Sequence, residues 1–205
     1  MAQHSILVIG AAGKSGTPVV QQAIARGHRV TAFVRHPEKA VHLPANARIV
    51  QGDATDAEAV LRAIADNDVV IITVGDRKTF VSAAAARNAV AAMHSNGARR
   101  IILLSAYGIG DSAHGLHGFV LSKVLGRLNA DKVASESAVE QSGLDWTAVR
   151  PPVLGEGPST GALKSGVDIT INGFQSISRE DLATFMLEQI DKPDYVGKKP
   201  IVYAK

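Results

Sequence analysis

The sequence predicts an α/β protein whose core is a doubly wound, mostly parallel sheet with helices on both faces. Short, wholly apolar runs recur along the chain, which is typical of strands buried on both sides of a parallel sheet. Amphipathic helical patterns separate these runs, so that strand and helix alternate six times without an internal repeat. With 205 residues and 46% hydrophobic content, the chain is expected to form a single domain over residues 1–205.

The first strand and the glycine-rich turn after it carry the most specific signal. Residues 6–9 are apolar and rich in β-branched side chains, and a helical pattern begins after the turn. Three glycines spaced by three residues allow a tight turn, a close approach to an anion and close packing of the helix on its strand. The N–H groups and the positive dipole end of such a helix favour a pyrophosphate. The sequence therefore predicts a Rossmann-like nucleotide-binding loop, rather than a plain tight turn, with contacts from Gly10, Ala12, Gly13, Lys14, Ser15 and Gly16.

The second strand, residues 29–34, ends in a basic segment at the point where this fold meets the adenosine ribose. An acidic side chain there accepts hydrogen bonds from both ribose hydroxyls, whereas an arginine attracts a 2′-phosphate. Arg35 occupies this point, and Lys39 and Lys14 add positive charge. We therefore expect NADP(H) to be favoured over NAD(H). The alternative is a solvated basic turn.

The third strand, residues 48–51, leads to a turn that contains Asp53 and Ala54, which we expect to contact the adenine. The alternative role for Asp53 is that of a turn or cap acceptor. Thr55 and Glu58 have the spacing of a capping box, which predicts a helix that Thr55 caps.

The fourth strand, residues 68–74, ends at Val74 and Gly75, where the absent side chain of glycine would let a cofactor lie against bare backbone. Arg77 follows at the same edge of the sheet. It is either a contact for a phosphate or an acidic substrate, or a surface residue.

The rest of the chain continues the alternation of strand and helix. The predicted elements are a helix at 79–96, a strand at 99–104, a helix at 119–141, a strand at 146–149, a strand at 167–171, a helix that Ser178 caps with Asp181 in the box position, and a strand at 200–203 that closes the sheet. Residues 155–166 contain four glycines and are predicted to form a mobile flap. We expect small substrate-pocket elements from residues 106–130 and 151–178.

A catalytic Tyr-x-x-x-Lys pair, in which a lysine one helical turn away activates a phenol, is not predicted. Tyr107 is followed at the fourth position by Asp111. Tyr195 and Lys199 have the right spacing, but they follow a proline and span Gly197, so that no helix aligns them. An alcohol dehydrogenase that must take a proton from its substrate is therefore not expected.

Ser105 follows the fifth strand, beside the place where a nicotinamide would lie, and is the candidate catalytic residue. Its hydroxyl can bond the carboxamide or donate to a substrate carbonyl or ring nitrogen; the alternative is a polar strand terminator. The backbone from Pro151 to Leu154 is expected to lie against the carboxamide. Tyr107 and Val153 are candidate substrate contacts.

Composition excludes several other classes of function. The chain has no cysteine, which excludes disulfides and thiol chemistry and fits a reducing, cytoplasmic location without a leader. A formal charge of +3, spread along the chain, does not indicate nucleic-acid or membrane binding. His114 and His117 are interpreted as loop histidines rather than metal ligands, since no third ligand is evident. We expect a monomer or a weak homo-oligomer.

Taken together, these motifs resemble the atypical short-chain dehydrogenase/reductases, and most closely the flavin reductase/biliverdin-IXβ reductase group and its bacterial NAD(P)H-binding relatives. The resemblance covers essentially the whole chain. The segments that carry it are Gly10–Gly16, Val34-Arg35, Gly52-Asp53-Ala54, Val74-Gly75, Leu104-Ser105-Ala106, Gly143-Leu144-Asp145-Trp146-Thr147, Arg150-Pro151-Pro152 and Ser178–Leu182.

The resemblance implies NADPH along the glycine-rich loop, with Arg35 on the 2′-phosphate and Asp53-Ala54 at the adenine. The ribose and nicotinamide would be surrounded by Val74, Gly75, Ser105, Pro151, Val153 and Leu154. It further implies hydride transfer to flavins, quinones or similar planar small molecules, which can take their proton from water. Vertebrate members carry pocket histidines where Val153 and Lys132 align, so tetrapyrrole reduction is not predicted. The alternatives are a redox-sensing, NmrA-like protein that binds dinucleotide without turnover, and an epimerase or dehydratase.

Overall fold

Six parallel strands form the central sheet of the computed structural model, which describes residues 2–75, 80–112, 129–169, 171 and 175–205. The strands are β1 (Ser5–Ile9), β2 (Arg29–Val34), β3 (Arg48–Gln51), β4 (Val69–Ile72), β5 (Arg100–Leu104) and β6 (Asp145–Val149). They lie in the order β3-β2-β1-β4-β5-β6, and all their pairings are parallel. The strand order runs outward in both directions from the β1/β4 pair, which confirms the doubly wound, Rossmann-like fold class.

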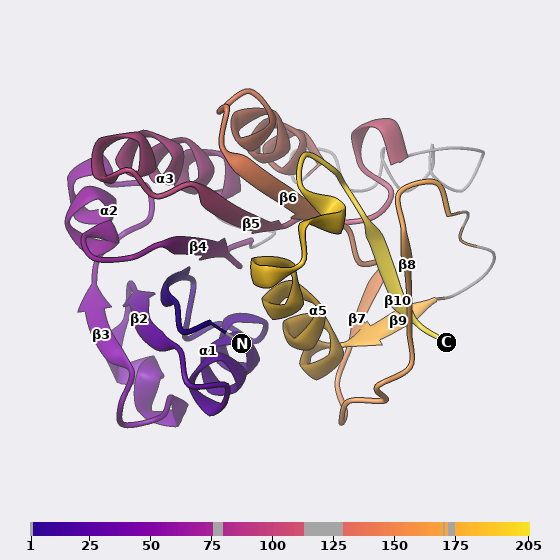
Figure 1. Ribbon diagram of the computed structural model, residues 1–205, viewed down its shortest axis with the longest axis horizontal. Helices are drawn as coiled ribbons and strands as arrows, with labels where there is room; N and C mark the ends of the chain where they lie inside the picture. The colour runs from indigo at the N-terminus through magenta and orange to yellow at the C-terminus, as the bar shows by residue number, and fades with distance from the viewer. Residues whose placement is uncertain (1, 76–79, 113–128, 170, 172–174) are drawn as a thin grey trace.

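Helices cover both faces of this sheet (Figure 1). On one face lie α1 (Gly16–Ala25) and α5 (Arg179–Asp191), and on the other α2 (Ala57–Ile64), α3 (Ser82–Asn96) and a helix over residues 129–140. Side chains alternate along β1, so that Ile6 and Val8 join the first layer and Leu7 and Ile9 the second.

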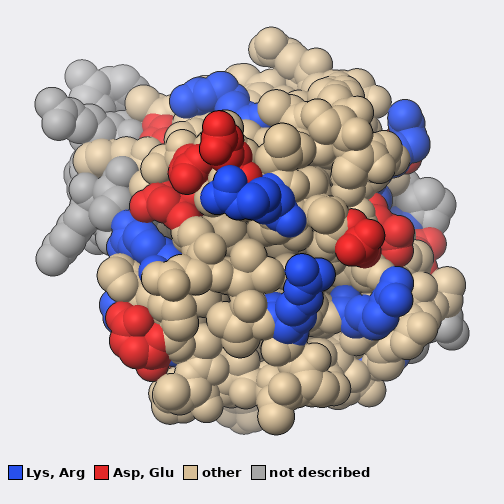
Figure 2. All heavy atoms as spheres, turned by 90° about the vertical axis from the view of Figure 1, so that its left-hand side faces the viewer, with Lys and Arg blue, Asp and Glu red and all other residues tan. Residues whose placement is uncertain are grey.

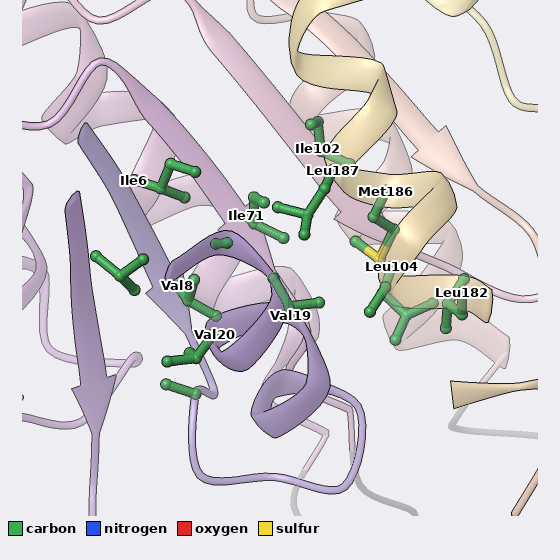
Figure 3. Packing of buried hydrophobic residues seen from close by; sticks show 14 of the residues in the cluster. Ile6, Val8, Val19, Val20, Ile71, Ile102, Leu104, Leu182, Met186 and Leu187 are labelled. Atoms are coloured by element: carbon green, nitrogen blue, oxygen red, sulfur yellow. The ribbon is translucent and has the colours of Figure 1, made fainter. Parts of the chain in front are cut away.

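The layer on the α1 and α5 face shows why these two helices lie side by side. Val19 and Val20 of α1, together with Leu182 and Met186 of α5, are buried against the strands (Figure 3). Both helices therefore present an apolar stripe to one continuous core. The two helices are consequently in direct contact with each other.

The C-terminal part differs from the sequence prediction. β7 (Val153–Gly155) pairs in parallel with β9 (Ser176–Ser178), and β8 (Leu163–Gly166) pairs antiparallel with β10 (Ile201–Ala204). The strand predicted at 167–171 is therefore wrong, because the pairing residues are 163–166, inside the predicted flap. The segment that leads into β10 runs beside the end of β6 through isolated parallel bridges from Lys198 to Thr147 and from Ile201 to Arg150, but β10 itself is not a strand of the central sheet as predicted.

Two predicted helix starts differ, and one predicted capping box does not form. Asp56, not Thr55, caps α2, since its Oδ1 accepts from the N–H groups of Glu58 and Ala59. The helix predicted from residue 79 begins at Ser82, with Val81 at its N-cap and Phe80 before that in a non-helical conformation with a φ of 46°. Ser178 caps α5 as predicted, but the Asp181 side chain does not complete a capping box. It binds a distant loop instead.

Asp181 fixes much of the segment that was predicted to be a mobile flap. Its buried carboxylate accepts hydrogen bonds from Ser159 Oγ, Thr160 N, Thr160 Oγ1 and Gly161 N. Burial raises the pKa of this group, but the hydrogen bonds outweigh burial and lower the pKa to about 2.

No helix within the described ranges is both long and apolar enough to cross a membrane. Basic and acidic side chains are interspersed over the face on the β3 side of the molecule (Figure 2). Charges of mixed sign largely cancel beyond a Debye length, so this face does not present a field of one sign.

The first prediction concerns Asp181→Asn. At pH 7 we expect the free energy of unfolding to fall by about 2 kcal/mol, because the lowered pKa measures how strongly the native state favours this carboxylate. The stabilisation by ionised Asp181 is fully present above the ordinary pKa of 3.8 and is lost as pH falls through about 2. The free energy of unfolding of the variant should therefore depend less on pH in this acidic range. Urea unfolding between pH 7 and pH 2 measures both effects. Asp168→Asn, at an exposed residue shortly after β8, is the control. Equal stability of the two variants would contradict the stabilising role of Asp181.

Candidate cofactor and active site

A cavity of about 580 Å³ opens at the carboxyl ends of β1, β2 and β4, where the strand order turns outward. The predicted contacts that line it are Gly10, Ala12, Gly13, Lys14, Ser15, Arg35, Asp53, Ala54, Val74, Gly75 and Leu154. Of the other predicted residues that are described, Gly16, Ser105, Tyr107, Pro151 and Val153 are not among its walls. Arg77 and the two loop histidines, His114 and His117, lie outside the described residues.

The glycine-rich loop has the form of an anion cradle. Gly10 has a φ of +88°, in the left-handed region that favours glycine, and its carbonyl accepts from the N–H of Gly13. Within the described ranges, the N–H groups of Ala12, Lys14 and Ser15 donate to no protein acceptor. These open donors lie at the N-terminus of α1, where the helix dipole adds positive potential. The loop therefore fits a bound pyrophosphate.

Gly16 does not line the cavity but packs against the backbone of Gly10, which does. A Cβ at this position would lie 2.1 Å from the Gly10 carbonyl oxygen, so only glycine allows α1 to begin directly against the end of β1. Gly52 allows a similar close approach, because a Cβ there would lie 2.5 Å from the ring of Phe33. Both glycines keep backbone close to the space that a dinucleotide would fill.

A basic cluster of Arg35, His36 and Lys39 lines the cavity after β2. Arg35 Nε donates to His36 Nε2 at 3.1 Å, and His36 Nδ1 lies 3.2 Å from Glu38 Oε1. With its Nε2 accepting, His36 carries its proton on Nδ1, toward Glu38. Glu38 is thus paired with His36, and Arg35 and Lys39 present two cationic side chains to the cavity.

Asp53 takes the turn role that was the alternative to adenine contact. Its Oδ1 accepts from both the N–H and the hydroxyl of Thr55, which hold the pKa of Asp53 below its ordinary value. Asp53 and Ala54 nevertheless line the cavity, where backbone can meet an adenine.

Ser105 begins a buried polar chain behind the carboxyl end of β5. Its side chain is only 4% exposed, and its Oγ donates to Glu136 Oε1. Arg150 donates to both oxygens of Glu136, at 2.8 and 2.6 Å, and also pairs with Asp111. The Ser105 proton is therefore committed to Glu136, which leaves the oxygen lone pairs as acceptors. Tyr107 contributes a backbone bond from its N–H to the Pro151 carbonyl.

Lys132 is a residue that the sequence prediction missed as part of the site. Its Nζ donates to the Leu104 carbonyl at 2.8 Å and approaches the Val74 carbonyl at 3.4 Å, directly beneath Gly75. Burial lowers the pKa of the ammonium to about 8, although the negative charges of Asp131 and Glu136 act in the opposite direction and raise it. The spacing of Lys132 and Glu136, one helical turn apart, was the available signal.

A family model described as NAD(P)H-binding matches residues 10–193. The chain belongs to this NAD(P)H-binding family. Bacillus subtilis YhfK, described as an uncharacterized sugar epimerase, is 28% identical over 197 residues, which cover 91% of this chain and 88% of YhfK. Phenylcoumaran benzylic ether reductase IRL1 of Ginkgo biloba is 28% identical over 218 residues, which cover 97% and 68% of the two chains. ChuY, an anaerobillin reductase from Escherichia coli O157:H7, is 27% identical with a TM-score of 0.84 over 97% of this chain and 96% of ChuY.

These relationships confirm the resemblance to atypical short-chain dehydrogenase/reductases. The chain is a member of a nicotinamide-dinucleotide-binding oxidoreductase family that includes reductases. Its cradle fits the cofactor, since the open amides of the loop supply hydrogen-bond donors at the wall of a cavity that Gly10 and Gly75 line.

The second prediction tests whether the buried, charged side chain of Lys132 lowers the stability of the folded protein. Its folded pKa of about 8 lies below the ordinary value of 10.5, so the native state binds this proton less tightly than the unfolded state does. Stability should therefore rise as pH increases from about 8 to 10.5. Lys132→Met should raise the free energy of unfolding at pH 7 by up to about 3 kcal/mol and remove that rise. Chemical denaturation at pH 7, 8.5 and 10 measures this, with exposed Lys192→Met as the control; a less stable Lys132→Met protein would contradict it.

Proposed function

We propose that this protein is an NADPH-dependent reductase that transfers hydride to a flavin-like or quinone-like planar acceptor. The observation that carries the proposal is one cavity in which the anion cradle before α1 and the basic cluster after β2 face the same space. That arrangement suits a dinucleotide with a pyrophosphate and a 2′-phosphate.

The preference for NADP(H) over NAD(H) rests on the end of β2. Arg35 and Lys39 line the cavity there, and the carboxylate of Glu38, a group that can accept from ribose hydroxyls, is paired with His36. An arginine fork binds a phosphate in bidentate fashion and leaves unphosphorylated ribose with weaker contacts.

The bound nicotinamide would supply the hydride. We propose that Ser105 acts beside it as an acceptor for the carboxamide N–H, with Glu136 holding the hydroxyl in place. Lys132 uses two of its three donors on the Leu104 and Val74 carbonyls, and the third is assigned to the ribose above Gly75. Neither group is placed to protonate an acceptor, which fits acceptors that take their proton from water.

The acceptor pocket is proposed to form at the edge of the cavity. Leu154 lines the cavity, and Val153 before it is 55% exposed, so both offer apolar contact to a planar ring. Pro151 would place its backbone against the carboxamide, and Tyr107 and Arg77 remain predicted substrate contacts. The names of ChuY and the Ginkgo relative, both reductases, support a reductase over the epimerase suggested by the name of YhfK.

The third prediction is an acceptor screen. Purified protein mixed with NADPH and FMN, FAD, quinones or redox dyes should oxidise NADPH, followed at 340 nm. Dinucleotide binding without oxidation of NADPH by any of these acceptors would favour the alternative of a redox-sensing binding protein and would count against the reductase.

The fourth prediction concerns Arg35→Glu. Replacing the guanidinium by a carboxylate repels the 2′-phosphate, so the affinity for NADPH should fall more than about tenfold, while that for NADH changes less than about threefold. Calorimetric titration of both cofactors measures this. Arg62→Glu, at an exposed arginine on α2, is the matched control. Equal losses for NADPH and NADH would place Arg35 away from the 2′-phosphate.

A further inference from the structure

A single carboxylate, that of Glu156, bridges two cations at the dinucleotide cavity. Its Oε1 lies 2.9 Å from Lys14 Nζ and 3.3 Å from Arg179 Nη1. Lys14 belongs to the glycine-rich loop, Arg179 is the first residue of α5, and both side chains line the cavity. The chain thus places its own anion between two cations that border the proposed phosphate site.

Arg179 is fixed by more than its ion pair with Glu156. Its side chain is 20% exposed, and its Nη1 donates to the Gly155 carbonyl at 3.0 Å. Its Nε is buried and has no hydrogen-bond partner in the described part of the chain. A buried guanidinium donor without an acceptor is unfavourable, so the fold holds Arg179 at the cavity wall at a cost in stability.

Glu156, in contrast, is held weakly. It is 75% exposed, and exposed ion pairs contribute little. It follows the last residue of β7 and precedes Gly157, whose φ of +129° lies in the region that favours glycine, so the backbone after Glu156 tolerates reorientation. The chain is fixed again only from Ser159, where Asp181 binds it. Glu156 is therefore free to leave, whereas Arg179 stays at the cavity wall.

We propose that Arg179 is a ligand for the pyrophosphate of the dinucleotide, acting with Lys14, and that Glu156 is the internal anion that both cations bind until the cofactor enters. The inference rests on the proposed binding of a dinucleotide in this cavity. A carboxylate and a phosphate oxygen accept the same charge-assisted hydrogen bonds, so they compete for these two donors. A pyrophosphate offers more acceptor oxygens and charge than one carboxylate, and so it displaces Glu156 toward solvent.

The test compares NADP⁺ with 2′-AMP, which carries the 2′-phosphate without a pyrophosphate. Glu156→Gln removes the competing charge and should tighten NADP⁺ binding about two- to fivefold. Arg179→Met should weaken it about tenfold or more, since a bond to a charged, partly buried donor is lost. The affinity for 2′-AMP should change less than about twofold in both variants. Glu188→Gln, which removes an exposed carboxylate paired with Lys192 on α5, is the control and should change neither.

A double variant, Arg179→Met with Glu156→Gln, tests whether Glu156 acts on NADP⁺ binding through Arg179. With Arg179→Met in place, the gain from Glu156→Gln should shrink, because the two residues act through one contact. If Arg179→Met does not fold, Arg179→Lys serves, with an expected loss of about threefold because the bidentate fork is missing. Unchanged NADP⁺ affinity in the Arg179 variants would overturn the ligand role, and unchanged or weaker affinity in Glu156→Gln would overturn the competition. A wild-type protein that binds no NADP⁺ at all would instead overturn the proposed function.

Discussion

The contact between the backbones of Gly10 and Gly16 is the constraint on which the rest of the site depends. A side chain on Gly16 would overlap the Gly10 carbonyl, so α1 begins against the end of β1 only because Gly16 carries no Cβ. The open amides of the loop and the dipole of α1 consequently face the space bordered by β2 and β4. Residues from distant parts of the chain then add charge to a cradle that backbone alone already forms.

Charged groups on the two sides of Gly75 have different roles in the proposed reaction. On the cavity side, Lys14, Arg35 and Arg179 line the wall, and we propose that these cations select and hold phosphate groups. Behind the backbone, Lys132 and Glu136 are buried and hydrogen-bonded, so that they position neighbouring groups instead of binding ions from solvent. Selection of the cofactor and placement of its reacting end are therefore assigned to separate sets of residues.

Much of the fold and of the cofactor half of the site was predictable because its signals are local. The apolar run of β1, the glycine spacing and Arg35 after β2 each lie within one short segment, and the cavity contains these residues as predicted. The errors lie where local patterns compete. Thr55 and Asp56 are both good caps, and the structure uses Asp56 because Thr55 is engaged by Asp53. The glycines at 155–166 indicated flexibility, but a distant carboxylate holds part of that segment.

The sequence by itself determined the succession of the six strands of the central sheet, the nucleotide loop and the family, since periodicity, turn residues and short motifs act between neighbours along the chain. Only the tertiary structure decided the contacts of Lys132, Asp181, Glu156 and Arg179. Glu156 meets Lys14 across 142 residues, and Arg179 reaches the cavity because α5 packs beside α1. Hydrogen bonds and ion pairs depend on separations of a few ångströms, and such separations between distant segments are set by how the helices pack on the sheet.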